Sequence, residues 1–305
     1  MSPQEKAFQA ALRERLATRA QLLLATDREV LALLQAARGA IMEQLATLPS
    51  DFNQWRLPQL LAQLQAVLDG ATGSAAGRLD AGLRAAWQQG EDLVDNTLAA
   101  GGINVQTQLP LLNTGVLVQL RSFATLRLKD VGAEAATLIG RQLGLATIGG
   151  VTPFEAIRKI QALLGGESPR RATTIVRTEM GRAYALANQQ RMAQAAARVP
   201  GLQKQWRRSG KIHSRWNHDA IDGQVVDVNK PFTLPSHNGP VQMMYPHDPA
   251  APPEEVINCG CIALPYKKNW RVATPGARPF TGLELQLDPR KARLDQAAKR
   301  AGLRR

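Results

Sequence analysis

Apolar residues recur at every third or fourth position through most of the first 150 residues, and this period constrains the fold more than any other feature of the chain. Between Glu5 and Leu48 the recurring positions are Phe8, Leu12, Leu16, Leu23, Val30, Leu34, Ile41, Leu45 and Leu48. This spacing predicts one long amphipathic helix, broken at Pro49-Ser-Asp51. Aromatic residues make up only 5% of the sequence, whereas Ala and Leu are abundant, and this composition favours helix over sheet.

The same period predicts further helices up to Gly149-Gly150. Their expected ranges are about 58–68, from about 75 to about 100, 111–129 and 131–145. The Gly- and Ser-containing stretch 69–74 is expected to be a loop. Residues 1–150 show no cluster of titratable or metal-binding residues, so we interpret this half as a helical domain without chemistry of its own.

Capping signals mark the start of the second half. Thr152-Pro153 with Glu155 has the pattern of a capping box, which predicts a helix to about residue 164. Ser168-Pro169 begins a helix to about residue 198, whose buried stripe is expected to contain Ile175, Met180, Tyr184 and Ala187.

Short strands are expected after Gly201. They cover 202–207, 224–228 (after the turn Asp222-Gly223) and 257–264, while 229–256 and 265–287 are expected to lack regular structure. A basic helix follows from Asp288-Pro289. The sequence thus predicts an α+β fold with a helical domain over 1–150, a small α+β domain with a short antiparallel sheet over 151–270, and a basic tail with a short helix over 271–305.

The net charge of +13 belongs entirely to the second half. Residues 1–150 contain 13 Lys and Arg against 13 Asp and Glu, and residues 151–305 contain 25 against 12. This asymmetry indicates one part that docks on protein and another that meets a polyanion, although a merely solubilising surface is the alternative. No apolar run approaches the roughly 20 residues of a membrane span, and the first residues lack the apolar segment of a signal peptide. We therefore expect synthesis in the cytoplasm.

One group of residues could bind a metal. Cys259 and Cys261 are the only cysteines, and a disulfide between them would close a small strained ring. On a strand both thiols would face the same side, and His213 with His218 could complete a tetrahedral zinc site. The alternative is that the cysteines are small buried hydrophobes and that the protein needs no cofactor.

The sequence offers little for catalysis. A Cys–His pair or a cluster of His218, Asp219 and Asp222 is conceivable, but no nucleophile elbow or phosphate-binding loop accompanies them. Arg177 and Glu179 are two residues apart on one helix, so they do not face each other. We expect each of them to anchor that helix to the small sheet, and we predict no catalytic residue and no enzymatic activity.

The order of several short motifs resembles the Mu F-like domain of phage head morphogenesis proteins, over about residues 150–265. The positions that carry the resemblance are Arg177, Glu179, Trp206, Arg215, His218, Asp222, Gly223, Phe232, Pro246, Asp248, Asn258, Cys259 and Cys261. Two positions depart from the family pattern. Gly260 stands where the family has arginine between the cysteines, and His247 stands where it has glycine in a Pro-Gly-Asp turn.

The resemblance implies a minor head (capsid) protein of a tailed bacteriophage. Such a structural protein of the virion associates with the portal, takes part in head morphogenesis and in DNA packaging or delivery, and makes non-specific contact with DNA. Expected partners are the portal protein, packaged double-stranded DNA and, less directly, the major capsid or scaffolding protein, with no membrane in the assembled head. The DNA-facing residues are expected to be Arg207, Arg208, Lys267, Lys268, Arg304 and Arg305.

Two rival functions remain open at this point. One is a zinc-dependent nuclease or toxin-like hydrolase that uses His213, His218, Cys259 and Cys261. The other is a DNA-condensing protein unrelated to phage heads.

Overall fold

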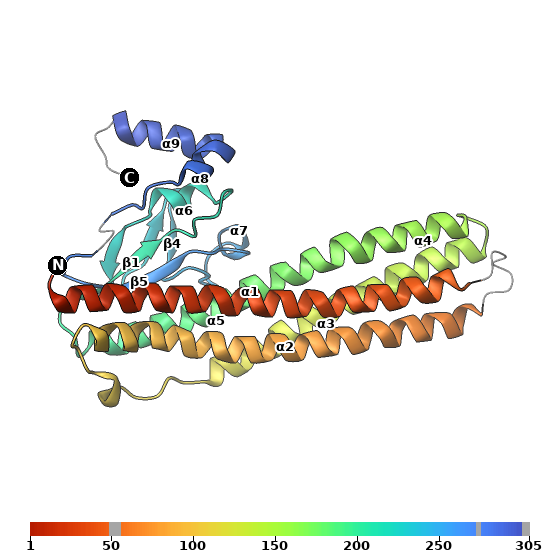
Figure 1. The fold of residues 1–305 in the computed structure, drawn as a ribbon, viewed down its shortest axis with the longest axis horizontal. Helices are drawn as coiled ribbons and strands as arrows, with labels where there is room; N and C mark the ends of the chain where they lie inside the picture. Colours follow the sequence, from red (N-terminus) through yellow and green to blue (C-terminus); the bar gives the residue numbers. More distant parts are fainter. Residues whose placement is uncertain (49–55, 273–275, 301–305) are drawn as a thin grey trace. The chain divides into compact units, whose positions relative to one another are not determined.

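A computed structural model describes residues 1–48, 56–272 and 276–300 of the chain (Figure 1). These residues form two compact units whose segments alternate along the sequence. The first unit consists of Met1–Ala20, Ala85–Thr114 and Met180–Arg305, and the second of Gln21–Arg84 and Gly115–Glu179. The boundaries at 150 and 270 remain predictions, but the expected α+β class is confirmed.

The first two thirds of the chain are helical, as the apolar period predicts. The elements are α1 (Pro3–Ala46), α2 (Leu57–Ala100), a short 3-10 helix (Gln106–Gln108), α3 (Gly115–Thr147), α4 (Pro153–Ala162), a π-helical turn (Leu163–Glu167) and α5 (Ser168–Ala196). The capping box at Thr152 is present, with reciprocal bonds between Thr152 and Glu155. The predicted break at Pro49-Ser-Asp51 lies outside the described residues.

Two predicted interruptions of the helices are wrong. Residues 69–74 continue α2 instead of forming a loop, because Thr72 in this stretch is buried and packs against the backbone of another helix. Its hydroxyl donates to the carbonyl of Leu68, and a Cβ added at Gly132 of α3 would lie 2.8 Å from its methyl group. Similarly, the two helices predicted at 111–129 and 131–145 are one, since Leu128, Val131 and Ala135 continue a single buried stripe.

The second unit is a helical bundle with an aliphatic core. Its buried residues come from five segments and include Ile41, Leu45, Leu60, Leu64, Leu68, Ala135, Ile139, Leu143, Ala156, Ile160 and Leu164. A bidentate ion pair between Arg121 of α3 and Asp80 of α2 joins two of these helices, at 2.5 and 2.8 Å. This unit therefore fits the expectation of a bundle stabilised by packed apolar stripes.

The first unit contains a three-stranded antiparallel sheet in the order β2-β1-β5. The central strand β1 (Leu202–Arg207) pairs with β2 (Val225–Asp227) and with β5 (Ile262–Lys267). A separate hairpin joins β3 (Phe232–Leu234) to β4 (Val241–Met243). The other elements are α6 (Trp216–Ala220), α7 (Pro253–Val256), α8 (Gly282–Leu287) and α9 (Pro289–Arg300).

Three local predictions in this unit need correction. The stretch 229–256 contains β3, β4 and α7, and 265–287 contains the end of β5 and all of α8. The last strand begins at Ile262 instead of residue 257. These elements are three to six residues long, which is too short for a period to emerge from the sequence.

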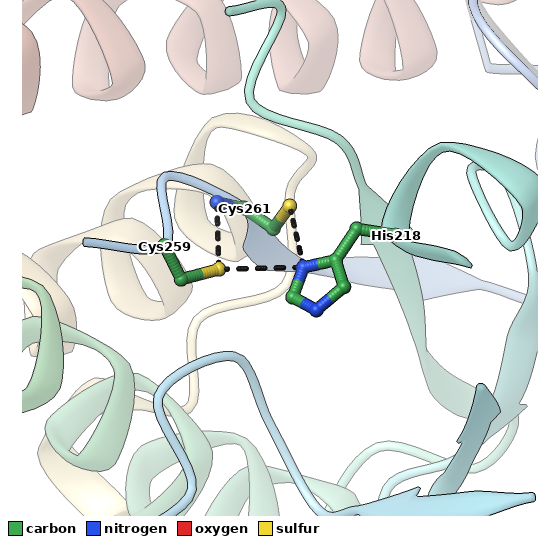
Figure 2. A group of neighbouring side chains, drawn as sticks. All are labelled: His218, Cys259 and Cys261. Carbon is green, nitrogen blue, oxygen red and sulfur yellow. Dashed lines mark hydrogen bonds between the residues drawn. The ribbon is translucent and has the colours of Figure 1, made fainter. Parts of the chain in front are cut away.

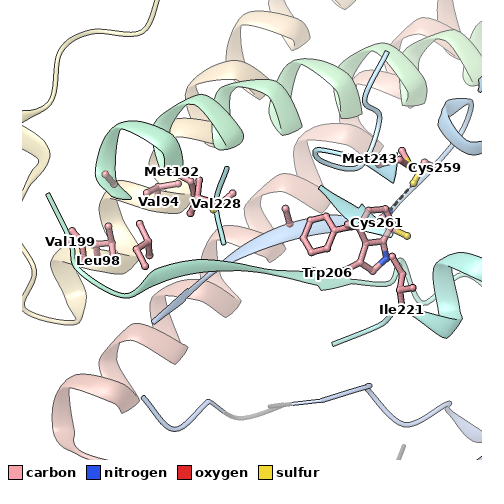
Figure 3. Packing of buried hydrophobic residues seen from close by; sticks show 14 of the residues in the cluster. Val94, Leu98, Met192, Val199, Trp206, Ile221, Val228, Met243, Cys259 and Cys261 are labelled. Atoms are coloured by element: carbon pink, nitrogen blue, oxygen red, sulfur yellow. Dashed lines mark hydrogen bonds between the residues drawn. The ribbon is translucent and has the colours of Figure 1, made fainter. Parts of the chain in front are cut away.

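Trp206 belongs to the apolar core of this unit (Figure 3). Its side chain is fully buried, and its ring meets those of Phe232 and His218 edge-on at 5.2 and 5.3 Å. The N-terminal and C-terminal segments also meet in this core, where the rings of Phe8 and Trp270 are 5.4 Å apart. The sheet thus shares one core with residues far away in sequence.

Side chains of α5 attach this helix to the sheet. The amide of Asn188 donates to the carbonyl of Ala263 in β5 at 2.7 Å, and the amide of Gln189 donates to the carbonyl of Val228 at 2.9 Å. Helix α2 approaches α5 closely at Gly90, where an added Cβ would lie 2.4 Å from the carbonyl oxygen of Tyr184. The predicted buried stripe Ile175, Met180, Tyr184 and Ala187 is confirmed.

Candidate functional site

Three buried side chains that can bind a metal converge in the first unit (Figure 2). The Nδ1 atom of His218 lies 3.6 Å from the Sγ atom of Cys259 and 3.5 Å from that of Cys261. Each of the three atoms lies within 4.8 Å of the other two. His218 belongs to α6, while the cysteines lie in the turn between α7 and β5.

The cysteines converge for a different reason from the predicted one. They do not lie on a strand, because β5 begins one residue after Cys261. Instead the turn brings the backbone N–H of Cys261 to within 3.4 Å of the Sγ atom of Cys259, and Asn258 takes a left-handed conformation with φ of 53°. Both thiols are free, as expected from the strain that a disulfide between them would carry.

The ring of His218 is held in one orientation. Its Nε2 atom lies 2.8 Å from Oε2 of Glu255, and the other carboxylate oxygen of Glu255 accepts a bond from the amide of Asn217. The indole N–H of Trp206 donates to the backbone carbonyl of His218 at 3.2 Å. No motif in the sequence pointed to Glu255, because this residue lies in the segment that was expected to lack regular structure.

The two thiols differ in their tendency to ionise. Hydrogen bonding to Cys261 keeps the pKa of Cys259 well below its usual value, against the effect of burial and with a further contribution from His218. Burial, together with the neighbouring charge on Cys259, raises the pKa of Cys261 well above its usual value. The two neighbouring thiols are therefore not equivalent.

The other histidines lie outside this group. His213 is 71% exposed, and its Nδ1 atom lies 3.7 Å from a carboxylate oxygen of Asp288. His237 packs its ring against that of Trp216. His247 is completely buried, which lowers its pKa to about 4 and keeps it neutral. The structure thus brings together three of the four predicted zinc ligands, and His213 is not one of them.

Arg207 and Arg208, two of the residues predicted to face DNA, are buried in the structure. Arg207 donates to the carboxylate of Asp222 and to the carbonyl of Gly276. Arg208 is 2% exposed and donates to Glu284, and its side chain packs on the ring of Phe280 at 4.5 Å. These guanidinium groups are used inside the protein, so they cannot meet a phosphate backbone.

The other predicted DNA contacts have different positions. Lys267 is half-buried and donates to the carbonyl of Pro200, whereas Lys268 is exposed. Arg304 and Arg305 lie outside the described residues. Exposed cations that the sequence interpretation did not single out are found on α9, at Arg290, Arg293, Lys299 and Arg300.

Arg177 and Glu179 anchor α5 to helices and not to the sheet, contrary to the expectation. Arg177 donates to Asp27 of α1 at 2.8 Å, and Glu179 accepts from Arg127 of α3 at 2.8 Å. Since Asp27 and Glu179 are both buried, each carboxylate needs the partner it has.

The remaining positions of the family signature tie the loops of the sheet together. Asp222 accepts backbone bonds from Arg208 and Arg278, and Gly223 has φ of 87°. Arg215 donates to the carbonyl of Ile257. Asp248 closes the turn after Pro246 by accepting from the backbone of Met244 and Ala250.

His247, which stands where the family has glycine, lies at a position with an unusual backbone conformation. This residue has φ of 70°, in the left-handed region that favours glycine. Its ring lies against α5, where a Cβ added at Gly181 would lie 2.4 Å from Nε2 of His247. The family pattern of glycine at this position therefore agrees with the backbone found here.

Part of this chain is similar in sequence to known proteins. Residues 139–264 match the family model described as Phage Mu protein F like protein. An uncharacterized protein of Bacillus subtilis, YqbB, is 35% identical over 97 residues, which cover 31% of this chain and 30% of that protein. The NAD(+)–arginine ADP-ribosyltransferase EFV of Enterococcus faecalis is 29% identical over 97 residues, or 32% of this chain and 19% of that protein. No solved structure matches the chain.

The family-model match shows that residues 139–264 are similar to phage Mu protein F, and the resemblance stated from the sequence is confirmed over this region. The region includes Trp206, the three converging side chains and most of the sheet. The family suggests a part in phage head morphogenesis and an association with the virion. The chain spans less than a third of the length of either relative.

Proposed function

We propose that this chain is a minor head protein of a tailed bacteriophage that associates with the portal and contacts packaged DNA. The observation that carries this proposal is the Mu F-like match, together with the burial of most of its signature residues. These residues hold a small domain together, and few of their reactive side chains are exposed to solvent. We therefore propose a structural role without enzymatic activity.

The helical second unit supports the protein-docking half of the proposal. It is a bundle with its own aliphatic core, the kind of element that packs against other helices. Among the described residues, no helix is long and apolar enough to cross a membrane. We infer that this bundle contacts the portal, with the capsid or scaffolding protein as a further partner.

Co-purification with the portal protein tests this role. The full chain, tagged and co-expressed with the portal protein of the same phage, is expected to elute with it in size-exclusion chromatography. Nuclease treatment before the column removes complexes bridged by DNA, and a tagged unrelated helical protein serves as the control. If the two proteins separate after nuclease treatment and the chain is missing from assembled heads, the proposed role is wrong.

Helix α9 supplies the best exposed cations for DNA contact. Arg290, Arg293 and Arg300 are separated by three and seven residues, so they share one face of the helix. Arg290 is 56% exposed even though it pairs with Asp288. Contacts between such side chains and phosphates are independent of DNA sequence and weaken with salt.

Reversing two of these charges is expected to weaken DNA binding. The R293E/R300E variant should bind duplex DNA less tightly at low salt, and the slope of log K against log salt should fall by about 0.9 for each phosphate that the variant no longer neutralises. Fluorescence anisotropy with labelled DNA over a salt series measures both effects. R141E/R158E is the matched control, because it changes the net charge equally at exposed positions on α3 and α4. Equal weakening in both variants would show that α9 does not bind the DNA.

The enzymatic name of one relative does not extend to this chain. The Enterococcus protein is an ADP-ribosyltransferase, but the matched stretch covers only 19% of it. We therefore do not propose this activity for the present chain.

A further inference from the structure

We propose that His218, Cys259 and Cys261 form a zinc site with three protein ligands and a fourth position open to solvent. The inference concerns a site that a structural role in the phage head does not require. Zinc binding at this site does not depend on the proposed contacts with the portal and DNA.

The distances between the three donor atoms fit a tetrahedral zinc ion. Zinc binds thiolate sulfur at about 2.3 Å and imidazole nitrogen at about 2.0–2.1 Å. In a tetrahedron these bond lengths place a sulfur about 3.6 Å from a nitrogen and two sulfurs about 3.8 Å apart. The observed separations of 3.6 and 3.5 Å between His218 Nδ1 and the two sulfur atoms match the first value. All three atoms also lie within 4.8 Å of one another, so the sulfur pair is compatible with the second.

The donor types favour zinc over the common hard cations. Two thiolates and one imidazole are soft or borderline ligands, whereas Mg²⁺ and Ca²⁺ take oxygen ligands. Three donor atoms that converge on one point meet the requirement of a metal site, which the packing of small apolar side chains alone would not impose. Zinc binds cysteine as the thiolate and histidine as the neutral imidazole, and both kinds of donor are present here.

The surrounding residues orient the ligands as in known zinc sites. Glu255 accepts from Nε2 of His218, which leaves Nδ1 with its lone pair toward the thiols. The backbone N–H of Cys261 donates to the sulfur of Cys259, and such a bond stabilises a bound thiolate. Glu255 itself is held by the amide of Asn217. The site is therefore pre-organised by neighbours that belong to the same unit.

A cavity gives access to the fourth position. It has a volume of about 320 Å³ and is lined by all three ligands, together with residues that include Ser209, Lys211 and His213. His213 is turned toward Asp288, so the fourth ligand would be a water molecule or an anionic oxygen from solution. The site thus has three protein ligands and one exchangeable position.

Metal analysis of the full chain tests the site directly. Protein purified without chelators, under reducing conditions that prevent a Cys259–Cys261 disulfide, is expected to contain one zinc per chain. Co²⁺ added to the zinc-free protein should give the visible absorption of a tetrahedral thiolate site. Cys261→Ser and Cys259→Ser should each lose both signals.

Glu255→Gln keeps the test decisive if the cysteine variants fail to fold. Glu255 positions His218 without being a ligand, so its replacement should weaken zinc affinity by about 10- to 100-fold while the far-ultraviolet circular dichroism stays unchanged. Glu254→Gln is the matched control, because Glu254 is the exposed neighbour on the same helix. His213→Ala should bind zinc as the wild type does.

Several results would overturn the proposal. Substoichiometric zinc after incubation and dialysis would do so, as would unchanged zinc affinity in a folded Cys261→Ser or Glu255→Gln variant. Loss of zinc in His213→Ala would show four protein ligands and would contradict the open position.

Discussion

Replacing Trp206 by alanine is expected to lower the free energy of unfolding by about 3–5 kcal/mol, which is the usual cost of removing a large aromatic side chain from a core. Trp206 is fully buried in the core of the first unit, beside Phe232 and His218. The variant also lacks the indole bond to the backbone of His218. Denaturant unfolding followed by circular dichroism measures the decrease in stability.

Phe154→Ala provides the control for this prediction. Phe154 is 73% exposed, so removing its ring should change the free energy of unfolding by no more than about 0.5 kcal/mol. A Trp206→Ala protein as stable as the Phe154→Ala protein would show that the core around Trp206 is not the one that stabilises the fold.

Glu284→Gln is expected to destabilise the protein by about 3–5 kcal/mol at neutral pH, because it removes the carboxylate that is hydrogen-bonded to two buried cations. Glu284 accepts from Arg208 and Lys291, which are 2% and 1% exposed. It also closes the capping box of α8 with Thr281. Thermal and denaturant unfolding at pH 7 measure this effect, with the exposed Glu254→Gln as the control.

The effect of Glu284 is also expected to depend on pH. Burial raises the pKa of this carboxyl, but hydrogen bonds from Arg208 and Lys291 outweigh burial and lower the pKa from 4.5 to about 2. A depressed pKa stabilises the folded state above the unfolded value of 4.5, and this contribution is lost as the pH falls toward 2. The stability difference between wild type and Glu284→Gln should therefore be constant above about pH 5 and shrink below it. A difference that grows on acidification would contradict this explanation.

The helices could be predicted from the sequence where the apolar period extended over many residues. The period from Phe8 to Leu48 predicted α1 closely, and capping signals at Thr152 and Ser168 predicted the starts of α4 and α5. The glycines at 70 and 73 misled the prediction, because composition suggests a loop while the buried Thr72 keeps the helix continuous. At this point the packing of Thr72 against Gly132 determines the structure more than the local composition does.

The candidate site was only partly predictable. The pairing of Cys259 and Cys261 with His218 followed from residue types, but the structure turns His213 toward Asp288. Glu255 is brought to His218 by the fold of α7, and no spacing in the sequence encodes that contact. The sequence shows the positive charges of Arg207 and Arg208 but not that they are buried. The acids that neutralise them, Asp222 and Glu284, lie 14 to 76 residues away in sequence.

The first unit is assembled from three stretches of chain, and this has a consequence for the order of folding. Phe8 and Trp270 share one core, and Glu5 accepts from the backbone of Arg271, a separation of 266 residues. During synthesis Glu5 and Phe8 must wait until Trp270 and Arg271 have emerged before they can find these partners. Contacts of such high sequence separation slow folding and leave apolar surface exposed in the meantime. The second unit lies between residues 21 and 179, so all of its residues are available for folding well before the first unit can be completed.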